Sequence, residues 1–139
     1  MSWIAWAVLS AVFASATTIL SKCGVAGLDP NLATAVRTTV VLLLAWGVAF
    51  TFGQPRELST LGHSSLLYLS ASGLATGLSW LCYFRALALG PASKVTPLDK
   101  LSVVFVLLLA WPFLGERLTA AKLAGGALIT AGAIVLTRA

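Results

Sequence analysis

Apolar residues along this chain gather into five long stretches, which polar, glycine-containing and proline-containing segments separate. Each stretch is close to the roughly 20 helical residues that cross a hydrocarbon core about 30 Å thick. A helix satisfies its own backbone hydrogen bonds, which lipid cannot do, so stretches of this length are expected to be helical. The pattern predicts an all-α integral membrane bundle of five transmembrane helices, at Trp3–Leu20, Leu32–Phe52, Ser65–Leu87, Ala92–Leu114 and Ala121–Leu136.

The composition agrees with a protein surrounded by membrane lipid. Hydrophobic residues make up 59% of the 139 residues and charged residues only 9%, against about 25% charged residues in soluble domains. We interpret residues 1–139 as a single transmembrane domain whose core is the packing between helices. The net charge of +5 is spread along the chain without a basic run, and this excludes nucleic acid as a partner.

The residues that usually carry enzymatic or metal chemistry are too few and too scattered for such a role. Cys23 and Cys82 are far apart in sequence, and the single histidine, His63, lies in the polar segment Gly53–Ser64, which we expect to be a loop. No nucleophile with a neighbouring base, carboxylate pair or metal-ligand cluster is present within the apolar stretches. We therefore expect no catalytic activity, no metal and no cofactor.

The fourth apolar stretch contains an acid and a base, Asp99 and Lys100. In a helix that begins at Ala92 they lie about 10–12 Å inside the membrane, where lysine can extend back to the headgroups and aspartate cannot. Since an ionisable residue within a span is by default a candidate functional residue, we interpret Asp99 as a protonatable or cation-pairing group. The alternative is a shorter helix that begins near Leu98 and leaves the pair at the membrane interface.

Arg37 in the second stretch lies about 8–10 Å from the start of its helix. Snorkelling toward the headgroups and a role in a binding site both remain open for it. The excess of embedded cations favours an anionic or zwitterionic substrate, on which aromatic rings of the third stretch could stack. The candidate residues for substrate binding or ion coupling are Asp99, Lys100, Arg37, Trp80, Tyr83, Arg85 and Lys94.

The third and fifth stretches carry small and hydroxyl residues at helical spacing. A row of hydroxyl residues, Ser72, Thr76 and Ser79, is a candidate lining for a polar cavity, although hydroxyl groups also form hydrogen bonds between packed helices. Glycines allow helices to approach closely, which makes them candidates for helix packing or a dimer interface. These glycines are Gly73, Gly77, Gly125 and Gly132.

The distribution of basic residues between the two membrane sides gives little preference for one orientation. When the embedded Arg37 and Lys100 are set aside, four basic residues lie on one side and three on the other, so the positive-inside rule barely distinguishes the orientations. Insertion in both orientations fits this distribution. The two groups are Lys22, Arg85, Lys94 and Arg138 on one side and Arg56, Arg117 and Lys122 on the other.

A set of short motifs, mostly in the second half of the chain, resembles the EamA-type transporters of the drug/metabolite transporter superfamily. Arg37 matches an arginine that such proteins tend to carry in the second helix. The sequence departs from the family pattern at Asp99 and Lys100, where longer members more often continue with apolar residues or proline. The matching motifs are Ala86-Leu87, Gly90-Pro91-Ala92-Ser93, Thr96-Pro97-Leu98, Phe113 to Thr119, Gly125-Gly126 and Gly132.

The resemblance implies a half-size transporter of the inner (plasma) membrane, because family members are usually ten-helix exporters made of two five-helix halves in opposite orientations. The expected substrate is a small metabolite, an amino acid or a drug-like compound, moved by alternating access. The second half would come from an antiparallel homodimer or from a related half-size chain. The alternative is a non-transporting subunit or a lipid-handling partner of a larger complex.

Overall fold

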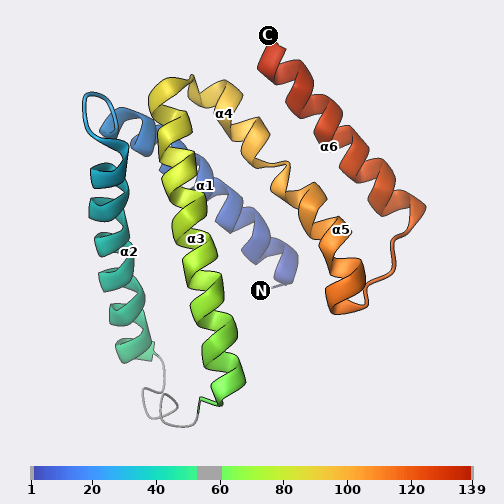
Figure 1. Ribbon diagram of the computed structural model, residues 1–139, viewed down its shortest axis with the longest axis horizontal. Coiled ribbons are helices and arrows are strands. Elements are labelled where there is room, and N and C mark those ends of the chain that lie inside the picture. The colour runs from blue at the N-terminus through green and yellow to red at the C-terminus, as the bar shows by residue number, and fades with distance from the viewer. Residues whose placement is uncertain (1, 53–60, 139) are drawn as a thin grey trace. The chain divides into compact units, whose positions relative to one another are not determined.

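The computed structural model describes residues 2–52 and 61–138, and this part of the chain contains α-helices and no strand. Five helical segments are long and apolar enough to cross a membrane, with α4 and α5 together forming the fourth. This confirms the predicted all-α class and the five spans, while Arg56 and most of the predicted loop lie outside the described residues. The helices in chain order are α1 (Trp3–Gly24), α2 (Pro30–Phe52), α3 (His63–Leu89), α4 (Ala92–Asp99), α5 (Ser102–Leu114) and α6 (Ala120–Arg138) (Figure 1).

The start of α2 is determined by Asp29 and Pro30. The Asp29 Oδ1 atom accepts hydrogen bonds from the backbone N–H groups of Asn31 at 2.9 Å and Leu32 at 3.0 Å. Aspartate is a preferred residue at this capping position, and proline suits the first helical residue because its missing N–H would have no partner there. The turn chemistry of the sequence therefore explains where the second span begins.

The end of α5 is determined by Gly115, which has a φ of 67°. A left-handed residue at this position is most easily a glycine, and it lets the next backbone N–H reach back to the helix end. Here the Glu116 N–H donates to the Ala110 carbonyl oxygen at 3.2 Å. Beyond this turn, the Glu116 carboxylate pairs with the Lys122 ammonium on α6 at 2.8 Å.

The chain divides into two compact units. The first unit contains α1, α4, α5 and α6, and within it α6 packs against both α4 and α5. In the same unit the Lys22 ammonium at the end of α1 donates a hydrogen bond to the Gly90 carbonyl oxygen, just before α4, at 2.9 Å. The second unit contains α2 and the residues of α3 up to Ala88.

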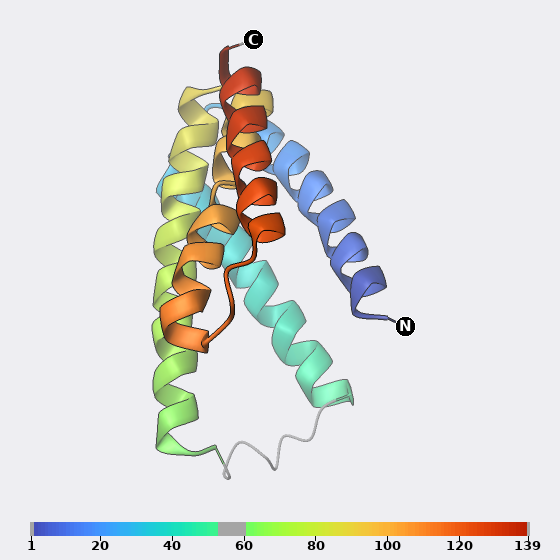
Figure 2. The ribbon, with the colours of Figure 1, turned by 90° about the vertical axis from the view of Figure 1, so that its right-hand side faces the viewer.

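Within the second unit, α2 and α3 run in opposite directions and draw apart toward Phe52 and His63 (Figures 1 and 2). Their closer ends are the start of α2 and the end of α3. Arg37 and Trp80 belong to these closer halves of the two helices. The side-chain contacts between the two helices described below lie in this region.

Few apolar side chains of residues 2–52 and 61–138 are buried. The buried apolar residues among the described ones are Val25, Phe84, Leu87, Ala110 and Ala133. Most of the leucines, valines and phenylalanines of the spans are instead exposed at the molecular surface. This is the arrangement expected of helices whose outer faces contact lipid tails rather than water.

Candidate functional site

The fourth span is interrupted at Lys100 and Leu101, between α4 and α5 (Figure 1). The sequence predicted one helix with a distortion near Pro97, and the structure differs by dividing the span into two helices. Lys100 and Leu101 keep right-handed backbone angles, with ψ values of −10° and −18°. These values are typical of a tightened, 3₁₀-like turn, so the chain continues in nearly helical form while its hydrogen-bond pattern changes.

Pro97 removes part of the regular hydrogen bonding before the break. It has no N–H, so the Ser93 carbonyl oxygen, four residues earlier, lacks its helical donor. The Pro97 carbonyl oxygen loses its own regular donor as well, because the Leu101 N–H bonds to the Leu98 carbonyl oxygen at 3.0 Å. Two backbone acceptors are thereby released from the helical pattern before the turn.

The same change of pattern continues on the far side of the break. The Val103 N–H donates to the Lys100 carbonyl oxygen at 3.1 Å, three residues back. The Asp99 carbonyl oxygen therefore lacks the donor that an uninterrupted helix would supply. Backbone carbonyls released within a span are polar groups that need a partner, because lipid offers none.

Asp99 and Lys100 contact each other at this break. The Lys100 Nζ atom lies 3.4 Å from Asp99 Oδ2, and the two side chains are 55% and 39% exposed, respectively. Because α4 begins at Ala92, Asp99 lies about 10 Å along the span. The helix start matches the longer of the two helices considered for this span, not a helix that begins near Leu98.

A second group of site residues lies between α2 and α3, and we call Arg37, Trp80 and Phe84 the cation–aromatic cluster. The guanidinium carbon of Arg37 lies 4.2 Å from the centroid of the Trp80 ring and 5.7 Å from that of Phe84. Trp80 and Phe84 are four residues apart on α3 and so lie on one face of that helix. Phe84 was not among the predicted site residues, although its spacing from Trp80 was the signal that could have found it.

The charge of Arg37 has no carboxylate partner among the described residues. The chain has four acidic residues, of which Asp29 caps α2. Asp99 and Glu116 each pair with a lysine. The fourth, Glu57, lies outside the described residues. Aromatic rings therefore supply the contacts that the structure describes for this guanidinium.

The other predicted site residues lie in varied surroundings. Tyr83 is half-buried on α3 and close enough to Arg37 to interact with it electrostatically. Arg85 is exposed and Lys94 is half-buried. The three hydroxyl residues of the predicted cavity lining, Ser72, Thr76 and Ser79, are exposed on α3. The Thr76 hydroxyl forms a hydrogen bond within its own helix, because its Oγ1 donates to the Ser72 carbonyl oxygen at 2.9 Å.

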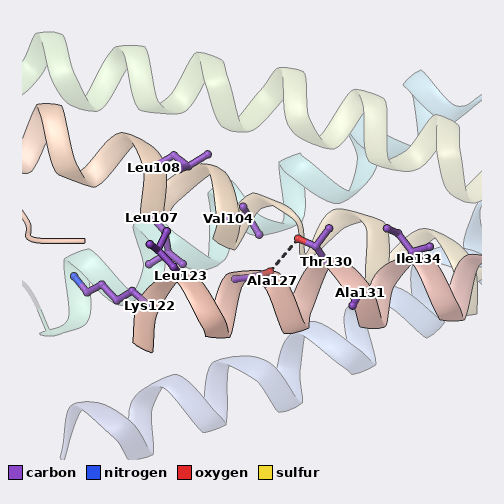
Figure 3. Close-up of a pocket in the computed structure, with 10 residues that line it drawn as sticks. Val104, Leu107, Leu108, Lys122, Leu123, Ala127, Thr130, Ala131 and Ile134 are labelled. Carbon is purple, nitrogen blue, oxygen red and sulfur yellow. Dashed lines mark hydrogen bonds between the residues drawn. The ribbon is translucent and has the colours of Figure 1, made fainter. Parts of the chain in front are cut away.

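A groove of about 380 Å³ lies between α5 and α6, where the sequence predicted none (Figure 3). Its lining is almost entirely aliphatic. The hydroxyl of Thr130 is occupied by a hydrogen bond to the Gly126 carbonyl oxygen at 2.9 Å. The groove therefore offers an apolar surface and little to recognise a polar substrate. It is lined by Val104, Leu107, Leu108, Lys122, Leu123, Gly126, Ala127, Thr130, Ala131 and Ile134.

The glycine at the close approach of α5 and α6 is Gly126. A Cβ atom added there would meet a Leu107 methyl at 3.5 Å and a Val104 methyl at 3.9 Å, which is ordinary van der Waals contact. A Cβ atom at any of the four predicted packing glycines would meet no described atom within 4 Å, so contact of these glycines with another chain stays a prediction. They are Gly73, Gly77, Gly125 and Gly132.

Five helical segments that are long and apolar enough to cross a membrane define a multi-pass membrane protein. The family description that matches residues 1–138 is "EamA-like transporter family". A protein from Sinorhizobium sp., named "Uncharacterized transporter in cobO 3'region", is 47% identical over 135 residues, which cover 97% of this chain and 96% of that protein. None of the solved structures matches the chain significantly. The chain belongs to the EamA-like transporter family, as its motifs predicted, and is a membrane transporter.

Proposed function

We propose that the chain is a secondary transporter of the inner (plasma) membrane that exports a small metabolite, an amino acid or a drug-like compound by alternating access. Its working form is an antiparallel homodimer, or a pair with a related half-size chain. The five spans act together as one repeat of such a transporter. The protein couples transport to an ion through Asp99.

The observation that carries this proposal is the break of the fourth span at Lys100 and Leu101. In transporters built from repeats, discontinuous helices place released carbonyls and helix ends near the middle of the membrane, where substrate and coupling ions bind. The break lies about 12 Å along a span of about 34 Å. It combines a carboxylate, an ammonium and carbonyl groups without helical donors, which together can exchange a proton or a cation.

The proposed dimer follows from the architecture of repeat transporters. A transporter of inverted repeats places its site at the interface of two halves with opposite orientations. The five spans correspond to one such half, and the balance of basic residues between the two sides permits both orientations. A second copy inserted the other way would complete the site.

The coupling role of Asp99 is tested by Asp99→Asn in proteoliposomes that contain a trapped pH-sensitive dye. A panel of amino acids and drug-like compounds is first screened for those that drive proton movement through the native protein. For such a compound, Asp99→Asn should reduce proton movement at least tenfold, because asparagine cannot carry the proton. Binding of the compound, measured separately, should change much less.

The matched control is Asp29→Asn, which also neutralises one acid. Asparagine caps helices as well as aspartate does, so α2 should keep its start and the protein its flux. Proton movement through Asp99→Asn at the native rate would remove Asp99 from the coupling role. Equal loss in both variants would show that the effect comes from the net charge of the protein.

The antiparallel arrangement is tested by a topology assay with a reporter fused to each terminus in turn. Dual insertion predicts that each reporter gives signal from both sides of the membrane, in comparable amounts. Removing Arg138, by Arg138→Gln, should leave three basic residues on each side and keep the two signals balanced. Signal from one side alone would rule out the antiparallel homodimer and leave the pairing with a related half-size chain.

A further inference from the structure

Arg37 carries a charge inside a membrane span, at about 10 Å from Pro30 at the start of α2. An arginine at such a depth usually faces a protein interior or a water-filled cavity and pairs with another group. Its side chain is half-buried. The groups that contact the guanidinium, and the donors that they leave free, therefore indicate which ligand this arginine can bind.

The guanidinium of Arg37 lies nearer to one of the two α3 rings than to the other. The start of α2 and the end of α3 lie at the same end of this helix pair (Figure 1). Of the two rings, Phe84 is nearer to that end, about 8 Å from Leu89, whereas Trp80 is about 14 Å from it. The guanidinium lies closer to Trp80, at 4.2 Å, than to Phe84, at 5.7 Å. The nearer ring is therefore the one farther from the end of α3.

Stacking on the two rings leaves the N–H donors of Arg37 without an acceptor among the described residues. A guanidinium over an aromatic face is held by its flat side, while its five N–H donors lie in its own plane. Tyr83 is an electrostatic neighbour of Arg37, and the described ion pairs do not include this arginine. Two of the N–H donors in parallel match the two oxygens of a carboxylate or a phosphate.

No acid of the described chain is paired with Arg37, since Asp29 caps α2 and Asp99 and Glu116 each lie beside a lysine. We infer that Arg37, held by Trp80 and Phe84, binds the oxyanion group of the transported compound, a carboxylate or phosphate. The inference rests on the proposed transport function and adds the class of substrate: a small organic anion or zwitterion. A phospholipid headgroup carries the same chemistry and is the other source of an oxyanion.

The test measures binding to the full-length protein in a maltoside detergent, which contains no phosphate. The probes are benzoate and inorganic phosphate, with benzamide as a neutral match to benzoate. The readouts are calorimetry and tryptophan fluorescence. We expect binding of at least one anion and none of benzamide. Arg37→Gln should abolish the binding, and Arg37→Lys, which keeps the charge without the planar fork, should weaken it at least tenfold.

Two control variants separate Arg37 from general charge effects. Arg138→Lys, at the exposed end of α6, should bind the anion with native affinity. Glu57→Gln should also leave the affinity unchanged. A several-fold gain in affinity for Glu57→Gln would show that Glu57 is the countercharge of Arg37 and would overturn the inference.

Lipid is tested as the source of the oxyanion by titrating a short-chain phosphatidylglycerol in the same detergent. Arg37-dependent binding of the lipid without binding of benzoate or phosphate would assign the site to a headgroup and overturn the substrate assignment. Absence of any Arg37-dependent anion binding would also overturn it. Proton flux that depends on Asp99 but not on Arg37 would remove this inference and leave the proposed transport function intact. Arg37-dependent anion binding without any transport would support the anion site and contradict the proposed transport function.

Discussion

The two units of the chain hold positive charge in different ways. In the unit that contains α4, α5 and α6, Lys100 lies 3.4 Å from Asp99 and Lys122 lies 2.8 Å from Glu116. In the α2–α3 unit, Arg37 lies over aromatic rings and has no carboxylate partner among the described residues. An ammonium is a compact point charge, whereas a planar guanidinium can stack on its flat side and still offer donors in its plane. The comparison identifies Arg37 as a stacked cation whose N–H donors no described carboxylate engages.

The two ion pairs also differ from each other. The 2.8 Å distance between Lys122 and Glu116 is that of a good charged hydrogen bond, about 2.7–2.9 Å. The 3.4 Å contact between Lys100 and Asp99 is longer than this range, and it joins adjacent residues at a tightened turn. A loosely held carboxylate beside released backbone carbonyls can exchange its partner, which is the property that ion coupling requires.

Arg37 is held by aromatic rings, whereas Lys100 and Lys122 are held by carboxylates. The largest change in stability that tests this difference is expected from replacing the rings around Arg37. In double-mutant cycles with Arg37→Gln, Trp80→Leu should show a coupling energy of about 1 kcal/mol, within the range for partly buried cation–π contacts. Phe84→Leu should show a clearly smaller coupling, because its ring is farther from the guanidinium. Unfolding in mixed micelles of detergent and dodecyl sulfate gives the free energies.

Phe84→Leu alone is expected to reduce stability, because Phe84 is only 3% exposed and its truncation leaves unfilled space. The single-variant values are therefore a poor measure of the cation contact, and the coupling energy is the relevant quantity. Equal coupling for the two rings would contradict the close stacking on Trp80. Zero coupling for both would mean that the rings only fill space.

A smaller change in stability is expected from Pro97→Ala, which tests the break in the other unit. The new N–H can bond to the Ser93 carbonyl oxygen and add about 0.5–1.5 kcal/mol, while the loss of proline adds about 0.4–1 kcal/mol of conformational entropy to the unfolded chain. These contributions oppose each other, so the unfolding free energy should change by less than about 1 kcal/mol. Proton flux should nevertheless fall several-fold, since the released carbonyl regains a partner.

Pro112→Ala is the matched control, because Pro112 lies inside α5, where the helix continues without a break. This variant should have little effect on flux. If both variants transport at the native rate, the interruption of the fourth span serves no role in transport. If both lose flux equally, the cause is a general change in helix rigidity.

The spans themselves could be predicted because lipid restricts the choices of the backbone. The fourth span was predicted at Ala92–Leu114 and the second to end at Phe52, and both boundaries agree with the structure. Hydropathy changes sharply at such boundaries, and local turn chemistry, such as that of Gly115, reinforces them. These signals depend on neighbouring residues and can be recognised in a single sequence.

The contacts between helices could not be predicted in the same way. Spans that are apolar on all sides have no polar face to indicate their rotation, so hydropathy does not show which residues meet. Arg37 and Trp80 were each predicted as site residues, but their contact depends on the rotation and offset of α2 against α3. Likewise, Gly125 was favoured over Gly126, and one residue on a helix changes the direction by about 100°.

The charged break in the fourth span also affects how this protein enters the membrane during synthesis. An aspartate and a lysine near the centre of a segment each oppose transfer from the translocon by about 2.5–3.5 kcal/mol, whereas each leucine, valine or phenylalanine favours it by about 0.3–0.6 kcal/mol. The apolar residues of α5 only roughly offset this opposition. We therefore expect neighbouring helices that are already present to assist the entry of this segment, so that the order of helix assembly matters for the biogenesis of the transporter.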